Sequence, residues 1–295
     1  MPLDGVSLAQ TYEKNGFVAP LDVLSSEEAL EIRRKLEDWR ASLTSEGRLI
    51  RFKSHLLLPW LSDLIRRKEI LDAVSLCGLG DDILLWDCEW IIKEPHTQGV
   101  FAWHQDATYS DLSPPDQVVT AWLALSESND ESGAVRYIPS AEKVQLPHRE
   151  VAGTQNLLLR GQEVSVSVEE EKAVAAVLRP GQMSLHSDFV LHASGSNRTE
   201  DSRIGLAMRF FSKRVACETK REVREGATLC RGKYVPTEGA FDLDEAPGVL
   251  MGPEELKRHR EALLKMEANY MRGFAEGRPK DYTQSLQGEA VAVTA

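Results

Sequence analysis

The first 80 residues place apolar side chains at the spacing of amphipathic helices. In residues 25–43, apolar positions from Ala29 to Trp39 recur every three or four residues, which predicts one buried helical face. Serines at the start of this segment, followed by two glutamates, are typical of a capped helix. Residues 58–78 carry a similar pattern that ends at a glycine, and they predict one or two further helices.

The pattern changes after Gly80 to short apolar segments bounded by turn residues. These segments are rich in Val, Ile and aromatic residues, which favour strands. Many short strands separated by turns are typical of an antiparallel sandwich or barrel rather than of alternating βαβ units. The segments are DILLWDCEWIIKEP, VVTAWLALS, AVRYIPS, EVSVSV, QMSLHS and IGLAMRFFS.

Helical spacing returns in residues 253–276, and the last dozen residues are expected to form a loose tail. We therefore expect a single domain over 1–295. It would consist of a helical part to about residue 80, an all-β core over about 81–215, and C-terminal wrapping over 216–295.

Composition narrows the possible partners. The chain has 295 residues, 42% of them hydrophobic, which is enough for a full core. Its formal net charge of −11 argues against nucleic-acid and membrane-surface partners, although a small anion can still bind a locally basic site. The four cysteines form no CxxC pair, which favours reduced thiols in a cytoplasmic protein. We see no signal peptide and no apolar run of membrane-spanning length.

Two polar motifs stand out in the β-rich part. WHQD contains His104 and Asp106, which would share one face of a strand while Gln105 points away. LHASGSNRTEDSRIGL contains His192 and, eleven positions later, Arg203. Two imidazoles and one carboxylate are the ligands of a facial triad, which holds Fe(II) and leaves positions open. Arg203 adds a permanently charged fork suited to a carboxylate.

The third metal ligand has an alternative. An isolated HxD pair arises often by chance, but its combination with a distant His–Arg segment is far more specific. His186 lies six positions before His192 and competes with it. We prefer His192 because it directly precedes the segment from Ser194 to Arg203, and we expect His186 near the site or the substrate. His259, in the late helical segment, is expected to be solvated.

These motifs belong to a longer resemblance to the phytanoyl-CoA dioxygenase family of Fe(II)- and 2-oxoglutarate-dependent oxygenases. The resemblance covers most of the chain. An ENG-type turn of the family reads ESG at 131–133, and a PGSH-type segment reads PSAE at 139–142. The second segment therefore lacks the family's histidine, which is not one of the expected iron ligands. The matching segments are YEKNGFVAPLDVLSSEEALEIRRKLE, FAWHQDATY, VVTAWLALSESNDESGAVRYIPSAEK and RPGQMSLHSDFVLHASGSNRTEDSRIGLAMRF.

The resemblance implies a double-stranded β-helix, that is, a cupin-like jelly roll. It implies Fe(II) held by His104, Asp106 and His192, with 2-oxoglutarate chelating the iron and its far carboxylate on Arg203. With O2, such an enzyme hydroxylates a C–H bond and releases succinate and CO2. Related halogenases carry a small residue at the position of Asp106, so a carboxylate there argues against chlorination.

Further cosubstrate residues follow from the same resemblance. A hydroxyl and a tryptophan near the cosubstrate map onto Ser194 and Trp122, and a lysine before the barrel maps onto Lys53. Trp122 has an equally good explanation as a core residue of a strand. His55 is an alternative to Lys53 in assisting the cosubstrate.

The substrate is the least constrained part of the prediction. If Lys53 and Lys93 both face the pocket, a small anionic or zwitterionic metabolite or natural-product intermediate fits best. Lys93 also fits a solvated edge position, and Tyr109 also fits a loop cover. The candidate substrate-binding residues are His55, Lys93, Tyr109, His186 and Asp188.

Two other classes of protein fit the same residues. One is a cupin metal enzyme that needs no cosubstrate, in which Arg203→Ala would matter little. The other is a non-catalytic binding protein that has kept the fold. The intact ligand set argues against the second, because proteins that have lost activity commonly lose a ligand.

Overall fold

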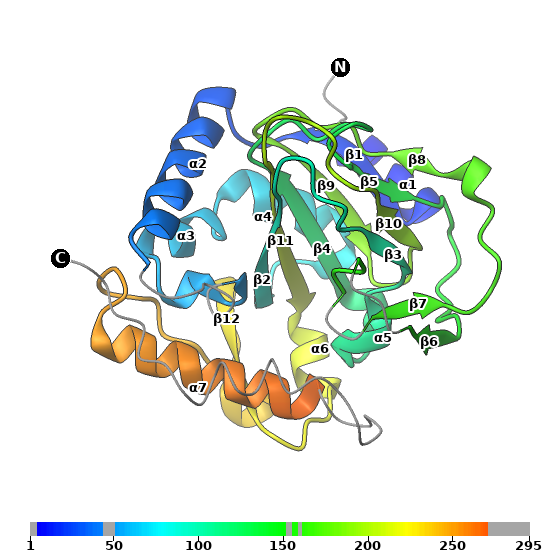
Figure 1. Ribbon diagram of the computed structural model, residues 1–295. Coiled ribbons are helices and arrows are strands. Elements are labelled where there is room, and N and C mark those ends of the chain that lie inside the picture. Colours follow the sequence, from blue (N-terminus) through cyan, green and yellow to red (C-terminus); the bar gives the residue numbers. More distant parts are fainter. Residues whose placement is uncertain (1–4, 44–50, 152–154, 159–160, 271–295) are drawn as a thin grey trace.

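The computed structural model describes residues 5–43, 51–151, 155–158 and 161–270. Within them a seven-stranded and a four-stranded sheet form the body of the molecule, with helices beside and below them (Figure 1). The helices are α1 (Gly5–Asn15), α2 (Ser26–Ala41), α3 (Pro59–Leu64), α4 (Lys68–Val74), α5 (Ala107–Ser110), α6 (Lys213–Glu218) and α7 (Pro253–Tyr270). The strands are β1 (Phe17–Asp22), β2 (Ile83–Lys93), β3 (Phe101–His104), β4 (Val118–Ala124), β5 (Val135–Tyr137), β6 (His148–Glu150), β7 (Gln162–Val164), β8 (Val174–Ala175), β9 (Gln182–Ser187), β10 (His192–Ser194), β11 (Arg203–Ser212), β12 (Glu225–Arg231) and β13 (Phe241–Leu243).

Helix α2 begins as its sequence predicts. The Ser25 hydroxyl accepts a hydrogen bond from the Glu28 backbone at 3.1 Å, and the Glu28 carboxylate accepts one from the Ser25 backbone at 2.9 Å. This capping box satisfies two backbone donors that the helix itself leaves free. Ala29, Leu36 and Trp39 form its buried face, which confirms the predicted helix.

The larger sheet has the strand order β1-β9-β4-β11-β2-β12-β13 and is antiparallel except for the β12–β13 pair. One of its faces packs against the N-terminal helices. Ile204, Leu206 and Met208 of β11 share a buried cluster there with Leu36 of α2 and Ile70 of α4. Because side chains alternate along a strand, the residues between them point to the opposite face.

That opposite face looks toward the smaller sheet, β3-β10-β5-β8. Trp122 of β4 and Ala207 of β11 are buried in one cluster with Val135 and Tyr137 of β5. Two sheets therefore enclose a common interior, and helices flank them. The predicted all-β core with flanking helices, folded as a jelly roll, is confirmed.

Strand β2 contains a bulge that matters for this interior. Arg209 of β11 pairs with Asp87, and the next residue, Phe210, pairs with Leu85, so Trp86 is the extra residue. A bulge lets two successive side chains reach the same side of a sheet. Trp86 and Asp87 accordingly both line the cavity between the sheets.

The C-terminal helix corrects one expectation. His259 is buried rather than solvated, because α7 packs against the segment before α3, where the Phe52 carbonyl lies 2.8 Å from His259 Nε2. Burial lowers the pKa of His259 to about 4. The predicted continuation of this helix to residue 276 and the predicted tail lie outside the described residues. The four cysteines are free, and no helix in the described ranges is both long and apolar enough for a membrane span.

Candidate functional site

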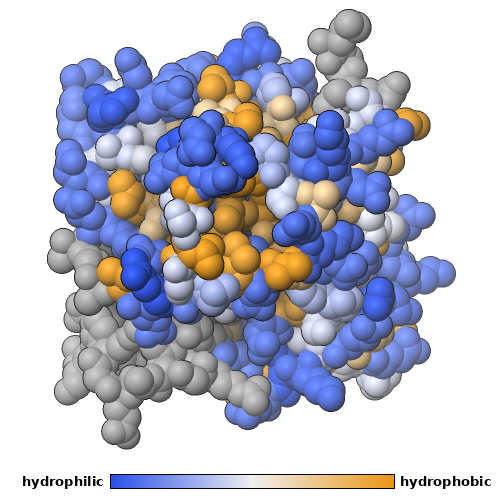
Figure 2. Space-filling model, turned by 90° about the vertical axis from the view of Figure 1, so that its right-hand side faces the viewer, coloured by the Kyte–Doolittle hydropathy of each residue, from blue (hydrophilic) through white to orange (hydrophobic). Residues whose placement is uncertain are grey.

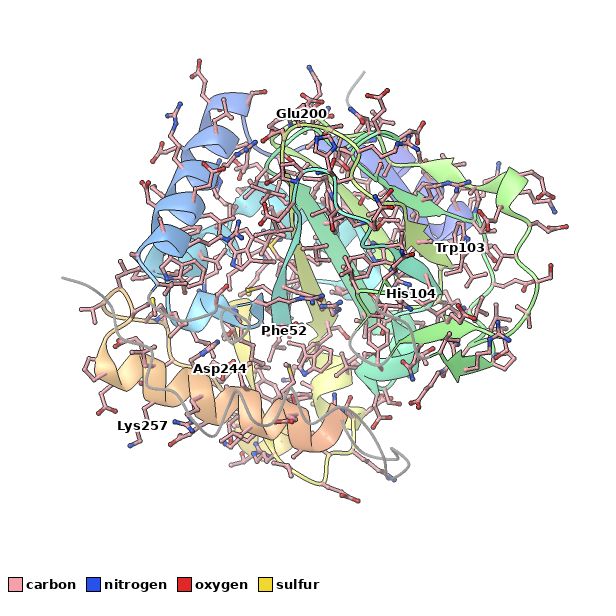
Figure 3. The ribbon with its side chains drawn as sticks, in the orientation of Figure 1. Phe52, Trp103, His104, Glu200, Asp244 and Lys257 are labelled. Carbon is pink, nitrogen blue, oxygen red and sulfur yellow. The ribbon has the colours of Figure 1, made fainter. Side chains whose placement is uncertain are left out.

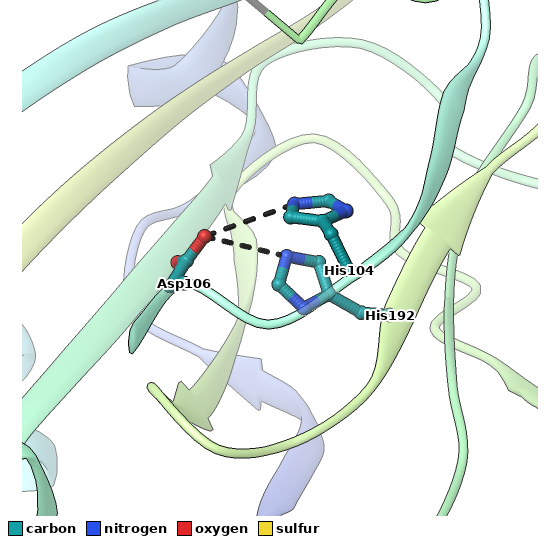
Figure 4. Close-up of side chains that lie close together, drawn as sticks. All are labelled: His104, Asp106 and His192. Carbon is teal, nitrogen blue, oxygen red and sulfur yellow. Dashed lines mark ion pairs between the residues drawn. The ribbon is translucent and has the colours of Figure 1, made fainter. Parts of the chain in front are cut away.

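Three predicted metal ligands converge inside the jelly roll. His104 ends β3 and His192 begins β10, and the two residues are direct partners across these strands. Asp106 Oδ1 lies 3.8 Å from His104 Nε2 and 3.7 Å from His192 Nε2 (Figure 4). One ligand atom from each residue lies within 4.8 Å of the others, so a single ion can contact all three.

Asp106 does not lie on the strand that the sequence predicted for it. The strand ends at His104, and Asp106 has helical backbone angles (φ −63°, ψ −31°) at the start of α5. The expectation that strand alternation aligns the two ligands is therefore wrong. Gln105 does point away, and its amide nitrogen donates to the carbonyls of Val144 (2.9 Å) and Phe189.

Backbone carbonyls fix the orientation of both imidazoles. His104 Nδ1 lies 2.6 Å from the Ala102 carbonyl, and His192 Nδ1 lies 3.0 Å from the Val190 carbonyl. A carbonyl only accepts, so each Nδ1 carries the proton and each Nε2 lone pair faces Asp106. Burial lowers the pKa of both histidines, which keeps the rings neutral. Neutral, pre-oriented imidazoles suit a divalent metal.

The carboxylate of Asp106 is held in its charged form by its neighbours, of which sequence reasoning missed Arg209 and Thr120. Burial alone would raise its pKa, but the charge of Arg209 and the nearby imidazoles hold that pKa well below its usual range. Arg209 Nε lies 3.8 Å from Asp106 Oδ2, Thr120 Oγ1 donates to Oδ2 at 3.1 Å, and the Tyr109 hydroxyl donates to Oδ1. Arg209 follows Arg203 by six positions on β11, so strand periodicity was a signal for it.

His186, the alternative ligand, lies beside the metal group without belonging to it. Its Nε2 is 3.4 Å from Asp106 Oδ2, and its Nδ1 is 3.0 Å from the Tyr137 hydroxyl. It lines the cavity, as the sequence suggested. Asp188 does not: it is fully buried and accepts from Ser110 Oγ at 2.8 Å. Burial, with the nearby Asp106 charge, raises the pKa of Asp188 to about 8.

Arg203 forms a second feature of the cavity wall. It is 1% exposed, and none of its three guanidinium nitrogens has a hydrogen-bond partner among the residues that the structure describes. The guanidinium lies 5.0 Å from the centre of the Trp122 ring. Burial lowers the pKa of Arg203 to about 9. A buried, unpaired guanidinium is costly unless an anion pairs with it, so this position fits a carboxylate ligand.

Ser194 and Lys93 lie next to this arginine. Lys93 Nζ donates to Ser194 Oγ at 2.7 Å and to the Gly195 carbonyl, and Lys93 pairs directly with Arg203 across the sheet. Ser194 lines the cavity, whereas Lys93 does not line it and is 1% exposed, so it is not a solvated edge residue. Burial, together with the charge of Arg203, lowers the pKa of Lys93 to about 6.

The structure places neither Lys53 nor His55 in the cavity wall, which corrects their predicted roles. Lys53 has a left-handed backbone (φ 49°), and its Nζ donates to the Gly226 carbonyl of β12 at 3.1 Å. His55 lies between Cys88 Sγ (3.1 Å) and Thr228 Oγ1 (2.9 Å). Both side chains are fully buried, and their nitrogen atoms contact residues of β2 and β12 in the larger sheet.

The same segment contributes Arg51 and Phe52 to the wall instead. Figure 3 shows Phe52 between α7 and the sheets, with His104 on the side of β3, whereas Lys257 points outward from α7. Of the predicted substrate residues, Tyr109 and His186 line the cavity. On the side of β5 and β8, hydrophobic side chains gather in a hollowed centre ringed by hydrophilic ones (Figure 2).

Two facing sheets that enclose a His–Asp–His group and an unpaired arginine define the class of non-haem iron oxygenases. The chain matches the family model of phytanoyl-CoA dioxygenase over residues 12–205 and belongs to this family. It is a dioxygenase that uses Fe(II), 2-oxoglutarate and O2.

Similar proteins include ectoine dioxygenase from Nocardia farcinica, which is 28% identical over 228 residues, or 68% of this chain and 76% of the relative. Peroxisomal phytanoyl-CoA dioxygenase from Homo sapiens is 29% identical over 151 residues, or 49% of this chain and 44% of the human protein. Among solved structures, the apo form of the non-heme monooxygenase ThoJ superposes with a TM-score of 0.78 at 29% identity. That match covers 89% of this chain and 97% of ThoJ.

Proposed function

We propose that the protein hydroxylates a C–H bond of a small polar metabolite or natural-product intermediate, releasing succinate and CO2. His104, Asp106 and His192 would hold Fe(II), and Arg203 would anchor the far carboxylate of 2-oxoglutarate. The observation that carries the proposal is the buried, unpaired Arg203 guanidinium in the wall of the same cavity as the His–Asp–His group. Residues 1–295 would act as one domain, since α2 and α4 share a core with the larger sheet.

The chain's own residues would bind and orient the reactants. Bound Fe(II) and 2-oxoglutarate supply, with O2, an oxidant able to attack an unactivated C–H bond. Ser194 and Trp122 would flank the cosubstrate, while Ile91 and Val135 keep this part of the wall apolar and limit water. The Asp106 carboxylate would fill the coordination position that chlorination needs for chloride, which favours hydroxylation.

Anaerobic titration tests the metal and cosubstrate assignments. Fe(II) with 2-oxoglutarate should give a visible charge-transfer band with the native protein, and His104→Ala should abolish it. His96→Ala is the matched control, because the His96 side chain is 57% exposed and pairs only with Glu200 in the described structure. A full band in His104→Ala would overturn the ligand assignment.

Turnover separates this proposal from its alternatives. Succinate formation should rise when the correct compound is added from a panel of small metabolites, and it should depend on 2-oxoglutarate. A cupin enzyme without a cosubstrate would turn over in the absence of 2-oxoglutarate. A binding protein would bind a panel member and form no succinate. Chlorinated product from the native protein would overturn the hydroxylation assignment.

A further inference from the structure

The arginines that line the cavity differ in their pairing with acidic side chains along β11. Arg203 and Arg209 both point inward but are six residues apart, which on a strand corresponds to roughly 20 Å. At the Arg209 end, the positive charges are already paired. Arg209 contacts Glu89 at 3.1 Å and Asp87 at 3.4 Å, and Arg51 contacts Glu89 at 2.8 Å. The two arginines there leave no surplus positive charge for an anionic substrate.

Glu267 adds a further acidic group at this end. It lies on α7, lines the cavity and is 7% exposed. Its Oε1 is buried without a hydrogen-bond partner, and no ion pair joins Glu267 to a basic side chain among the described residues. Burial raises its pKa. A carboxylate kept in such a place without a partner is unfavourable unless a ligand supplies a positive or hydrogen-bond-donating group.

The surroundings of Glu267 suit a cation with apolar substituents. Phe52, Trp86 and Met266 line the cavity beside it and belong to one buried cluster. The indole of Trp86 is fixed by its Nε1, which donates to Glu225 Oε2 at 2.8 Å. Aromatic rings attract cations through their faces, and a thioether is an adaptable apolar contact.

Arg221 is the remaining basic group near this wall. Its guanidinium lies 5.7 Å from the Trp86 ring centre. Its charge is matched by Glu225 at 3.4 Å and Asp111 at 3.7 Å. Besides the metal ligand Asp106, three acidic side chains (Asp87, Glu89 and Glu267) therefore line this end of the cavity, against two basic ones (Arg51 and Arg209).

We propose that Glu267 binds a cationic group of the substrate, so that the substrate class is a small amine, quaternary ammonium or positively charged nitrogen heterocycle, or a zwitterion bearing one. This inference rests on the proposed function and names the substrate class of the same site. It replaces the anionic substrate expected from Lys53 and Lys93, because neither lysine lines the cavity.

Calorimetric titration of the anaerobic Fe(II)–2-oxoglutarate holoenzyme tests the proposal with three matched probes. Benzylammonium, benzyl alcohol and benzoate share one ring and differ in charge. The native protein should bind benzylammonium about tenfold or more tightly than benzyl alcohol, and benzoate most weakly, because the ammonium group donates a charge-assisted hydrogen bond to Glu267 and the alcohol donates a weaker neutral one. Equal affinity for benzylammonium and benzyl alcohol would overturn the proposal.

Glu267→Gln should remove this preference by weakening benzylammonium about tenfold while leaving benzyl alcohol unchanged. Glu261→Gln is the control, because it makes the same change on the exposed face of α7. Unaltered benzylammonium binding by Glu267→Gln would count against the proposal. The variant should fold, since it removes an unpaired buried charge, and its thermal midpoint should equal or exceed the native one.

A second variant and a spectrum keep the outcome decisive. Glu267→Asp retains the charge and should keep a preference for benzylammonium. The charge-transfer band of the same samples reports the metal and cosubstrate site independently. A normal charge-transfer band without a preference for benzylammonium would contradict only this inference. The lack of a band in the native protein would contradict the proposed function.

Discussion

Gly205 on β11 leaves the space that the indole of Trp122 fills on β4. A Cβ atom added at Gly205 would lie 2.0 Å from Cζ2 of Trp122, far closer than atoms pack. The same indole lies beneath the Arg203 guanidinium at 5.0 Å. The lack of a side chain at position 205 therefore determines where the proposed cosubstrate anchor rests.

Gly205→Ala should weaken 2-oxoglutarate binding. The methyl group must displace the indole, and overpacking of this kind costs about 1–3 kcal/mol, which corresponds to roughly 5- to 150-fold in affinity if the cosubstrate site bears it. Titration of the charge-transfer band measures the dissociation constant. Gly248→Ala is the control, because its nearest neighbour would be 3.8 Å away. Native affinity in Gly205→Ala would contradict the proposed role of Trp122.

Arg203→Lys should raise the dissociation constant for 2-oxoglutarate by about tenfold or more, even though it keeps the positive charge. A lysine offers a point charge, whereas the guanidinium offers two parallel donors to a carboxylate. Arg203→Met should be worse still. Arg198→Met, at an exposed position, serves as the control. If both Arg203 variants bind 2-oxoglutarate like the native protein, Arg203 is not its anchor.

The affinity for 2-oxoglutarate should fall as the pH rises above about 6. Burial and the charge of Arg203 lower the pKa of Lys93 to about 6, so the free enzyme loses this proton early. A carboxylate bound beside Arg203 would raise that pKa again, so binding should take up a proton above about pH 6. Because one proton is taken up, the affinity can fall by at most tenfold for each unit of pH increase. Calorimetry in buffers of different ionisation enthalpy measures the proton uptake, and Lys93→Met should abolish it.

Arg209→Met should destabilise the metal-free protein by several kcal/mol. It leaves Asp87 and Asp106 buried with reduced neutralisation, and breaking a buried ion pair by removing one partner costs about 3–5 kcal/mol. Urea unfolding measures the change. Arg214→Met is the control, since the Arg214–Glu218 pair is exposed, and it should leave the unfolding midpoint in place. A native midpoint in Arg209→Met would show that Arg209 is not needed for charge balance.

The sequence predicted the fold and the convergent residues well because both follow from strong local signals. The capped helix at α2, the apolar strands and the HxD motif are each visible in a few consecutive residues. Arg203, the unpaired arginine of the cavity wall, was also recognisable because it follows His192 by eleven positions.

The end of the cavity near Glu267 was not predictable in the same way. Lys53 has a left-handed backbone, which its residue type does not signal, and its Nζ bonds the Gly226 carbonyl of β12 instead of facing the cavity. Trp86 and Asp87 share one face because of a bulge, which breaks the alternation on which sequence reasoning depends. Glu267 meets them only because α7 packs against that end of the sheets, and this packing joins segments about 180 residues apart.

The bulge in β2 has a consequence for how such an enzyme can diversify. On either side of the bulge, Leu85 and Cys88 lie in the cluster that the larger sheet shares with α2 and α4. Trp86 and Asp87 face the cavity between the sheets. Exchanging Trp86 or Asp87 would alter the cavity wall without disturbing the cluster that holds α2 and α4. Each replacement would nevertheless cost a buried contact, because Trp86 packs with Met266 of α7 and Asp87 pairs with Arg209.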